Sequence, residues 1–433
     1  MPFSESASAF GKFILTFGGM LFFLYFKLPL WLAILAGCLI LAALTSLPLG
    51  RLILIPPRTA VDADFIALLL MIFGILVLSG VQGASGQGRR QVRYMERIIP
   101  WPRVRLVIFP AMVGLLPMPG GALFSCPMLE EAAQGLNLDP RRKVLINYWF
   151  RHIWEVSWPL YPGYVLASSL LGLDLLTLLQ YTFPMVFTSF GLGWFFLMRD
   201  LAPPPDAGRP GPAEARAALI SFLYESLPLL VTLVGAVVFS LLISRFAPGV
   251  PSQAAFIFSV ALGIALALFQ GRGRMEAPLF KIAFNTGNFR LVLLVYAIFI
   301  FQDVIEASGL VSKIGAQGES GLLLLFLVTA LPFFSGLLTG IMVGFVGVCF
   351  PLIIGVILKS GLEGHMAPLI VMALVAGNVG MLLSPLHVCL VVTLEYFKSA
   401  YLDVWRTLFR PLAALTAAGA VWAVILHLLG AHF

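Results

Sequence analysis

The sequence has little charge: Asp, Glu, Lys and Arg make up 11% of its 433 residues, whereas 60% are hydrophobic. Soluble domains carry about 25% charged and 45–50% apolar residues, so the composition excludes an ordinary soluble protein. Apolar runs of about 18 residues, without two-residue alternation, predict membrane-spanning helices and exclude a β-barrel. The net charge of +7 fits basic cytoplasmic loops, and no nucleic-acid partner is expected.

Motifs for nucleotide-driven or hydrolytic chemistry are also missing. The chain has no Walker loop, dinucleotide fingerprint or G-x-S-x-G elbow. His152 and Glu155 form half of a helical zinc motif, but Val156 stands where a second histidine would be required. We therefore expect neither an enzyme, with catalytic residues of its own, nor direct coupling to ATP.

Cysteine is scarce, and its spacing does not indicate a metal site. The four cysteines all lie in apolar segments, where small core residues are expected. They are Cys38, Cys126, Cys349 and Cys389. The sequence thus predicts no metal and no organic cofactor, with Na⁺ considered only as a coupling ion.

Proline and glycine interrupt an apolar segment at about residues 105–133. Its centre, LLPMPGGALFSC (115–126), contains Pro117, Pro119, Gly120 and Gly121, which disfavour continuous helix. The arm before the interruption has about 12 residues and rises about 18 Å, little more than half of a ~30 Å hydrocarbon core. These features predict a re-entrant helical hairpin, with an ordinary kinked helix as the alternative.

The same plan recurs in the second half of the chain. A second hairpin is expected at about 322–358, interrupted by PFFSGLLTG (332–340). Discontinuous helices are expected at about 143–171, broken near Ser157 and Pro162, and at about 366–396, broken near Ser384. Broken segments at corresponding positions of two halves indicate the binding site of a transporter.

The predicted fold is all-α and membrane-embedded, with two inverted repeats at residues 1–200 and 217–433 joined by a cytoplasmic linker at 201–216. GVQGASG (80–86) and DVIEASG (303–309) are similar at the corresponding positions. Each half is expected to cross the membrane five times, an odd number, which inverts the second half. Most of the 27 Lys and Arg fall in loops on one predicted side, so the positive-inside bias places both termini outside the cell inner (plasma) membrane. The first apolar run is expected to be a retained span.

The hairpin tips and helix breaks supply the candidate substrate site. Glycine permits close approach to a ligand, helix N-termini favour anions, and carbonyl and hydroxyl groups suit Na⁺. The alternative is that these residues pack helices together and form local caps. The candidates are Gly120, Gly121, Ser125, Asn147, Arg151, Ser157, Ser335, Gly336, Thr339, Asn378 and Ser384.

Ionisable residues inside spans are costly and are therefore functional candidates. Arg151 is the candidate for holding an anionic substrate, while His152, Glu155 and His387 are candidates for proton or ion coupling. An alternative is a structural ion pair between Arg151 and Glu155, which are four residues apart. Arg290 is expected to reach the cytoplasmic interface.

This arrangement resembles the ion transporter superfamily, which includes gluconate, citrate, lactate and divalent-anion carriers and arsenite exporters, and within it a branch without an assigned function. The stretches LLPMPGGALFSCPM, ALPFFSGLLTG and GNVGMLLSPLHV carry the resemblance over nearly the whole chain. The divalent-anion branch has a Ser-Asn-Thr signature at its hairpin tips, whereas the tips here read Pro-Gly-Gly-Ala and Phe-Ser-Gly-Leu. The resemblance implies an elevator-type architecture, in which a transport domain moves against a scaffold, and a homodimer.

The expected function is therefore an H⁺- or Na⁺-coupled secondary transporter of small organic anions such as carboxylates, surrounded by membrane lipid. A cation/proton exchanger or inorganic anion exporter of the same fold is a second interpretation. A membrane-embedded enzyme or lipid-handling protein, using His152 and Glu155, is a third, and a channel is a fourth.

Overall fold

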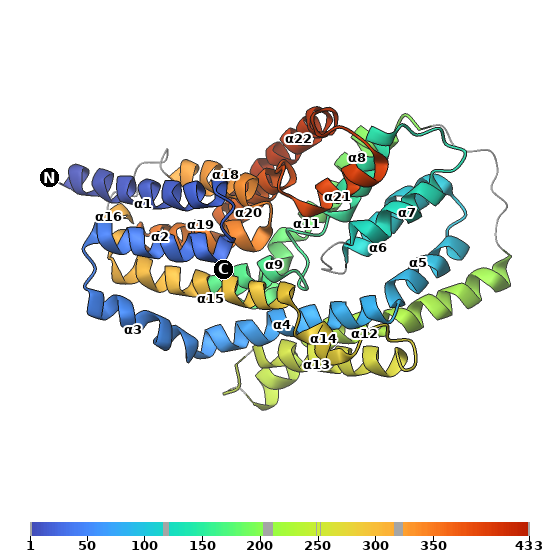
Figure 1. The fold of residues 1–433 in the computed structure, drawn as a ribbon, viewed down its shortest axis with the longest axis horizontal. Coiled ribbons are helices and arrows are strands. Elements are labelled where there is room, and N and C mark those ends of the chain that lie inside the picture. The colour runs from blue at the N-terminus through green and yellow to red at the C-terminus, as the bar shows by residue number, and fades with distance from the viewer. Residues whose placement is uncertain are drawn as a thin grey trace.

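The computed structural model describes residues 2–115, 121–201, 211–247, 249–251, 253–315 and 324–431, and every regular element in these ranges is a helix (Figure 1). The first half contains α1 (Pro2–Tyr25), α2 (Leu30–Thr45), α3 (Leu49–Ala60), α4 (Ala63–Ala84), α5 (Gln87–Ile98), α6 (Pro102–Gly114), α7 (Ala122–Ala132), α8 (Pro140–Arg151), α9 (Pro162–Leu170), α10 (Leu175–Thr182), α11 (Pro184–Gly193) and the π-helix η1 (Trp194–Met198). The second half contains α12 (Pro212–Phe246), α13 (Gln253–Gln270), α14 (Leu279–Ala283), α15 (Thr286–Ala307), α16 (Leu310–Gly315), the π-helix η2 (Phe326–Ala330), α18 (Leu331–Thr339), α19 (Met342–Lys359), the 3₁₀ helix η3 (Glu363–His365), α20 (Met366–Leu382), α21 (Val388–Phe397) and α22 (Tyr401–Leu428).

Among the described residues, eight helical segments are long and apolar enough to cross a membrane, which makes the chain a multi-pass membrane protein. They lie in α1, α4, α12, α13, α15, α19, η3 with α20, and α22. The bent pair α9 and α10, with 108° between its helices, would add a ninth. α19, expected as the arm of a hairpin, is itself long enough to span, whereas α2 is a shorter apolar helix.

On either side of the first expected interruption, α6 ends at Gly114 and α7 begins at Ala122, and the second interruption is shorter than the sequence predicts. In the first hairpin α6 packs against α7, and Pro117, Pro119 and Gly120 lie outside the described residues. In the second hairpin α18 packs against α19, and among its described residues, 324–358, only Gly340 and Ile341 are non-helical.

The prediction that residues 332–340 are unwound is wrong for all but the last of them. Pro332 is the second residue of α18 and lies within a continuous helical run rather than ending it. The turn before it widens into the π-helix η2, which connects directly to α18. Gly340 ends α18 with φ +66°, a left-handed conformation that glycine adopts readily.

The helices are interrupted in both segments where the sequence predicts discontinuous helices. Residues 152–161 separate α8 from α9, and residues 383–387 separate α20 from α21. We call these two segments the first break and the second break. The first break starts earlier than expected, because α8 already ends at Arg151.

Several helix contacts recur in the two parts of the chain. α1 packs on α2 as α12 packs on α13, and α6 packs on α8 as α18 packs on α20. Two contacts cross between the parts in matching fashion: α7 packs on α21, and α19 packs on α9. α4 and α15 are each followed by a left-handed glycine, Gly86 and Gly309, at the positions of the two similar sequence stretches. The inverted orientation of the halves remains a prediction from loop charge.

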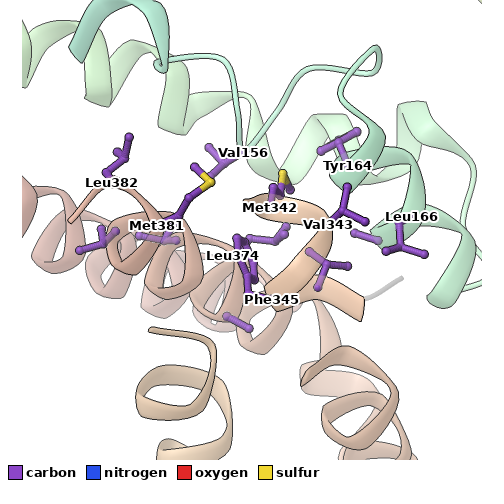
Figure 2. Close-up of a cluster of buried hydrophobic side chains, with 14 of the residues drawn as sticks. Val156, Tyr164, Leu166, Met342, Val343, Phe345, Leu374, Met381 and Leu382 are labelled. Atoms are coloured by element: carbon purple, nitrogen blue, oxygen red, sulfur yellow. The ribbon is translucent and has the colours of Figure 1, made fainter. Parts of the chain in front are cut away.

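An apolar core joins the two parts around the breaks. Figure 2 shows Val156 of the first break near Met381 of α20, with Tyr164 and Leu166 of α9 beside Val343 of α19. All five side chains are at most 7% exposed. The hydrophilic linker is shorter than expected, since α12 begins at Pro212 and includes residues up to 216.

Candidate functional site

Aromatic side chains of the first break donate hydrogen bonds to backbone carbonyls at the end of α6. The indole N–H groups of Trp154 and Trp158 donate to the carbonyls of Ala111 and Leu115 at 2.8 and 2.9 Å, and the hydroxyl of Tyr161 donates to the carbonyl of Gly114 at 2.6 Å. Because the last carbonyls of a helix have no partner within it, these three donors satisfy the end of α6. These hydrogen bonds therefore fix the position of α6, the first arm of the hairpin, relative to the first break and α8.

The second break is held in a similar way by tyrosines. Tyr148 of α8 donates its hydroxyl to the carbonyl of Leu382 at 3.0 Å, and Tyr401 of α22 donates to the carbonyl of Leu383 at 2.8 Å. Both carbonyls lie at the end of α20, where a helix leaves acceptors unpaired. Tyr148 thus ties the helix before the first break to the second break.

The two breaks meet at a pair of histidines. Nε2 of His152 lies 3.0 Å from Nε2 of His387, although the residues are 235 positions apart. Nδ1 of His152 lies 2.6 Å from the carbonyl oxygen of Tyr148, and Nδ1 of His387 lies 2.7 Å from that of Gly340. A carbonyl oxygen can only accept, so these contacts assign the proton of each ring to Nδ1.

Charged and polar groups surround the histidine pair. Nη1 of Arg151 donates to Sγ of Cys389 at 3.0 Å, and Oε1 of Glu155 lies 3.9 Å from Nε2 of His152. Arg151, His152, Glu155 and His387 are at most 7% exposed. We call these four residues and Cys389 the break-point cluster. A buried cation, a buried carboxylate and two rings are costly to desolvate, so this concentration of polar groups indicates a site.

Glycines at the described parts of the two hairpin tips lie close to the break-point cluster. A Cβ atom at Gly121, the residue before α7, would overlap the guanidinium of Arg151. A Cβ atom at Gly340 would lie 3.0 Å from the backbone nitrogen of His387. The first tip therefore packs against the Arg151 side chain at the end of α8, and the second packs against the backbone of the second break, a closeness that glycine permits. The two described tip glycines and the two breaks therefore lie beside the same buried cluster of ionisable groups.

Asn147 forms a second polar layer one turn before the cluster. Its Nδ2 lies 3.3 Å from Sγ of Cys126 in α7 and 3.3 Å from Oγ1 of Thr393 in α21. Its Oδ1 is buried without a hydrogen-bond partner among the described residues. Asn147 therefore connects the first hairpin, α8 and α21.

A family model described as "Protein of unknown function (DUF401)" matches residues 14–427. The chain belongs to the DUF401 family. Comparison with the curated proteins finds no match. The region shared with the other DUF401 proteins includes both hairpins and both breaks, so the whole break-point cluster lies within it.

Other predicted site residues of this DUF401 protein have local roles outside the cluster. The hydroxyl of Ser157 donates to the carbonyl of Thr182 at 2.6 Å, and Ser384 accepts from the N–H of Leu386 at 3.1 Å. The hydroxyls of Ser125 and Thr339 bond to carbonyls three and four residues earlier. The contacts of these hydroxyls are those of the alternative interpretation, in which the residues pack helices together and form local caps.

Gly336, Ser335 and Asn378 lie where α18 packs on α20. A Cβ atom at Gly336 would overlap the carbonyl oxygen of Gly377, so this glycine lets the two helices approach closely. Ser335 Oγ and Asn378 Oδ1 are buried without hydrogen-bond partners among the described residues. Gly120 lies outside the described residues.

Sequence reasoning missed Cys389 and Gly340. Cys389 was expected to be an inert core residue, but its sulfur lies against Arg151. The signal was its position two residues after His387, in the first turn of the helix that follows the second break. Gly340 was included in the interruption but not among the site residues, although its carbonyl orients His387.

A polar cavity lies elsewhere, where α3 meets the end of α15. It has a volume of about 720 Å³, and Arg51, Asp62, Asp303 and Glu306 are among its lining residues. No residue of the break-point cluster lines it. The cluster is enclosed, so a substrate would reach it only after the surrounding helices move.

Proposed function

We propose that this chain is an ion-coupled secondary transporter of small organic anions, such as carboxylates, that works by alternating access. The observation that carries the proposal is that Gly121, Gly340 and both helix breaks lie at the buried break-point cluster, which contains Arg151. Irregular backbone between paired broken helices is the typical position of a transporter's substrate site.

The surroundings of Arg151 favour an anion. Its guanidinium lies against Gly121, at the N-terminus of α7, where backbone N–H groups carry partial positive charge. A cation beside the positive end of a helix is unfavourable on its own, whereas an anion between the two is attracted by both. A carboxylate would also suit the planar fork of an arginine.

The matching contacts of the two halves support alternating access. α9 and α21 each pack against the second arm of the hairpin in the other half, α19 and α7 respectively. Two halves built in this way can exchange equivalent conformations on opposite sides of a shared site. Since the chain has no nucleotide-binding motif, an H⁺ or Na⁺ gradient is the proposed source of energy.

The direct test is uptake by proteoliposomes containing the purified protein. We expect a panel of radiolabelled carboxylates to include at least one that accumulates under an imposed H⁺ or Na⁺ gradient. Arg151→Gln should abolish this uptake, while Arg290→Gln, which removes an exposed arginine on α15, should leave it intact. The proposal is wrong if no organic anion is taken up under any gradient, or if Arg151→Gln transports normally.

A further inference from the structure

We infer that the break-point cluster is a binding site for a transition-metal cation of the Zn²⁺ class, with His152, His387 and Cys389 as ligands. This inference goes beyond the proposed transport function and does not rest on it. Its starting point is the 3.0 Å separation of the two Nε2 atoms.

The Nε2 atoms of His152 and His387, which point toward each other, are both hydrogen-bond acceptors. Because each Nδ1 donates its proton to a backbone carbonyl, each neutral ring presents the lone pair of Nε2 to the other ring. Two lone pairs at this distance repel unless an electrophile lies between them. Metal-binding histidines commonly have this arrangement, in which the second ring nitrogen donates to a carbonyl and fixes the ring orientation.

The distances fit a tetrahedral ion. With zinc–nitrogen bonds of about 2.0–2.1 Å, two nitrogen ligands at the tetrahedral angle lie about 3.3 Å apart, close to the observed separation. The sulfur of Cys389 and the two Nε2 atoms all lie within 4.8 Å of one another. A zinc–sulfur bond of about 2.3 Å places sulfur about 3.6 Å from each nitrogen, which a small rotation of the cysteine side chain can provide.

The neighbours complete the coordination and balance its charge. Glu155 is buried, its Oε1 lies 3.9 Å from Nε2 of His152, and its Oε2 has no hydrogen-bond partner among the described residues. Its carboxylate is therefore available as a fourth ligand. Arg151 donates to the sulfur of Cys389, so its charge stabilises the thiolate form that binds metals.

The ligand types select the class of ion. Two imidazoles with a thiolate suit Zn²⁺, Co²⁺ or copper, whereas Mg²⁺ and Ca²⁺ require oxygen ligands. His152 lies in the first break, His387 in the second and Cys389 in the first turn of α21, so the ion would join the two histidines, which are 235 residues apart in sequence. Such a site exists only in the folded chain, and binding should therefore raise the thermal unfolding temperature.

The test uses Co²⁺ and Zn²⁺ on the full-length protein after removal of bound metal with a chelator. An exposed histidine pair, His365 and His427, has its Nδ1 atoms 3.1 Å apart and could bind metal independently. The parent for the experiment is therefore the double variant His365→Asn/His427→Asn. We expect it to bind one Co²⁺ per chain, by elemental mass spectrometry, with a thiolate-to-cobalt charge-transfer band in the near-ultraviolet.

Variants of the ligands separate this site from adventitious binding. Cys389→Ser should eliminate the charge-transfer band, while Cys349→Ser, a buried cysteine in α19, should retain it. His387→Asn should weaken Co²⁺ binding about tenfold or more. His387→Cys should restore binding with a stronger band, which shows that the position itself supplies a ligand.

The inference is overturned if the parent binds no metal, or if Cys389→Ser keeps the band. It is also overturned if His387→Asn, shown by size-exclusion chromatography to be folded, binds Co²⁺ as tightly as the parent. These readouts do not involve transport, so failure of the metal site and failure of the transport function can be distinguished.

Discussion

Replacement of Gly340 by alanine should destabilise the protein and displace the second break. Gly340 has φ +66°, which costs an alanine about 1–2 kcal/mol. The added Cβ would also lie 3.0 Å from the backbone nitrogen of His387, and overpacking of this kind costs about 1–3 kcal/mol. The expected decrease in the free energy of unfolding is therefore about 2–5 kcal/mol.

Gly309→Ala is the matched control. Gly309 also follows a helix with a left-handed φ, +65°, but a Cβ atom there would meet nothing within 4 Å. This variant should lose only the backbone contribution of about 1–2 kcal/mol. Reversible unfolding in detergent, followed by tryptophan fluorescence, measures both. Equal losses would refute the argument that the hairpin tip packs closely against the second break, as would normal metal binding and transport by Gly340→Ala.

Three further predictions concern other parts of the chain. Glu225→Gln should lower the free energy of unfolding by about 2–3 kcal/mol in the same fluorescence assay, because the Glu225 side chain is 5% exposed and accepts two hydrogen bonds from Arg90, at 2.7 and 2.9 Å. The control is Glu276→Gln: the Glu276 side chain, which pairs with Arg89, is 67% exposed, so this variant should lower the free energy of unfolding by under about 1 kcal/mol. Gly121→Ala should leave stability nearly unchanged but abolish anion uptake, because the flexible Arg151 side chain must move away from the added Cβ; normal uptake would contradict this. A reporter enzyme fused to the C-terminus should be active outside the cell, and activity in the cytoplasm would refute the predicted topology.

The helix breaks could be predicted from sequence because proline and polar residues in apolar segments have few explanations. Ser384 and Pro385 lie within the second break, and Ser157 lies within the first. The start of the first break was missed because no breaker residue follows Arg151. Helix α8 ends there because Trp154, Trp158 and other aromatic groups bond to α6, and these are tertiary contacts that local sequence does not reveal.

The composition of the site could be predicted only in part. Arg151, His152, Glu155 and His387 stand out in any sequence because ionisable groups are rare in apolar segments. The alternative of an Arg151–Glu155 pair on one helix face assumed continuous helix up to Glu155, whereas α8 ends at Arg151; Oε1 of Glu155 lies 3.9 Å from Nε2 of His152. The pairing of the two histidines depends on how the halves pack together, and no spacing within either half could indicate it.

The proposed anion site and the proposed metal site together predict that the two ligands bind cooperatively. Without a metal, the carboxylate of Glu155 offsets part of the attraction that Arg151 and the N-terminus of α7 exert on an anion. A divalent ion bound by the Cys389 thiolate leaves a single net positive charge, which one carboxylate neutralises. The anion should therefore bind more tightly to metal-loaded protein, and by linkage the metal should bind more tightly when the anion is present.

A coupling of about 1–3 kcal/mol corresponds to a change in affinity of about 5- to 150-fold. Calorimetric titration of the transported carboxylate into Zn²⁺-loaded and chelator-treated protein measures this factor, and equal affinities in the two forms would show that the anion does not sense charge at the break-point cluster.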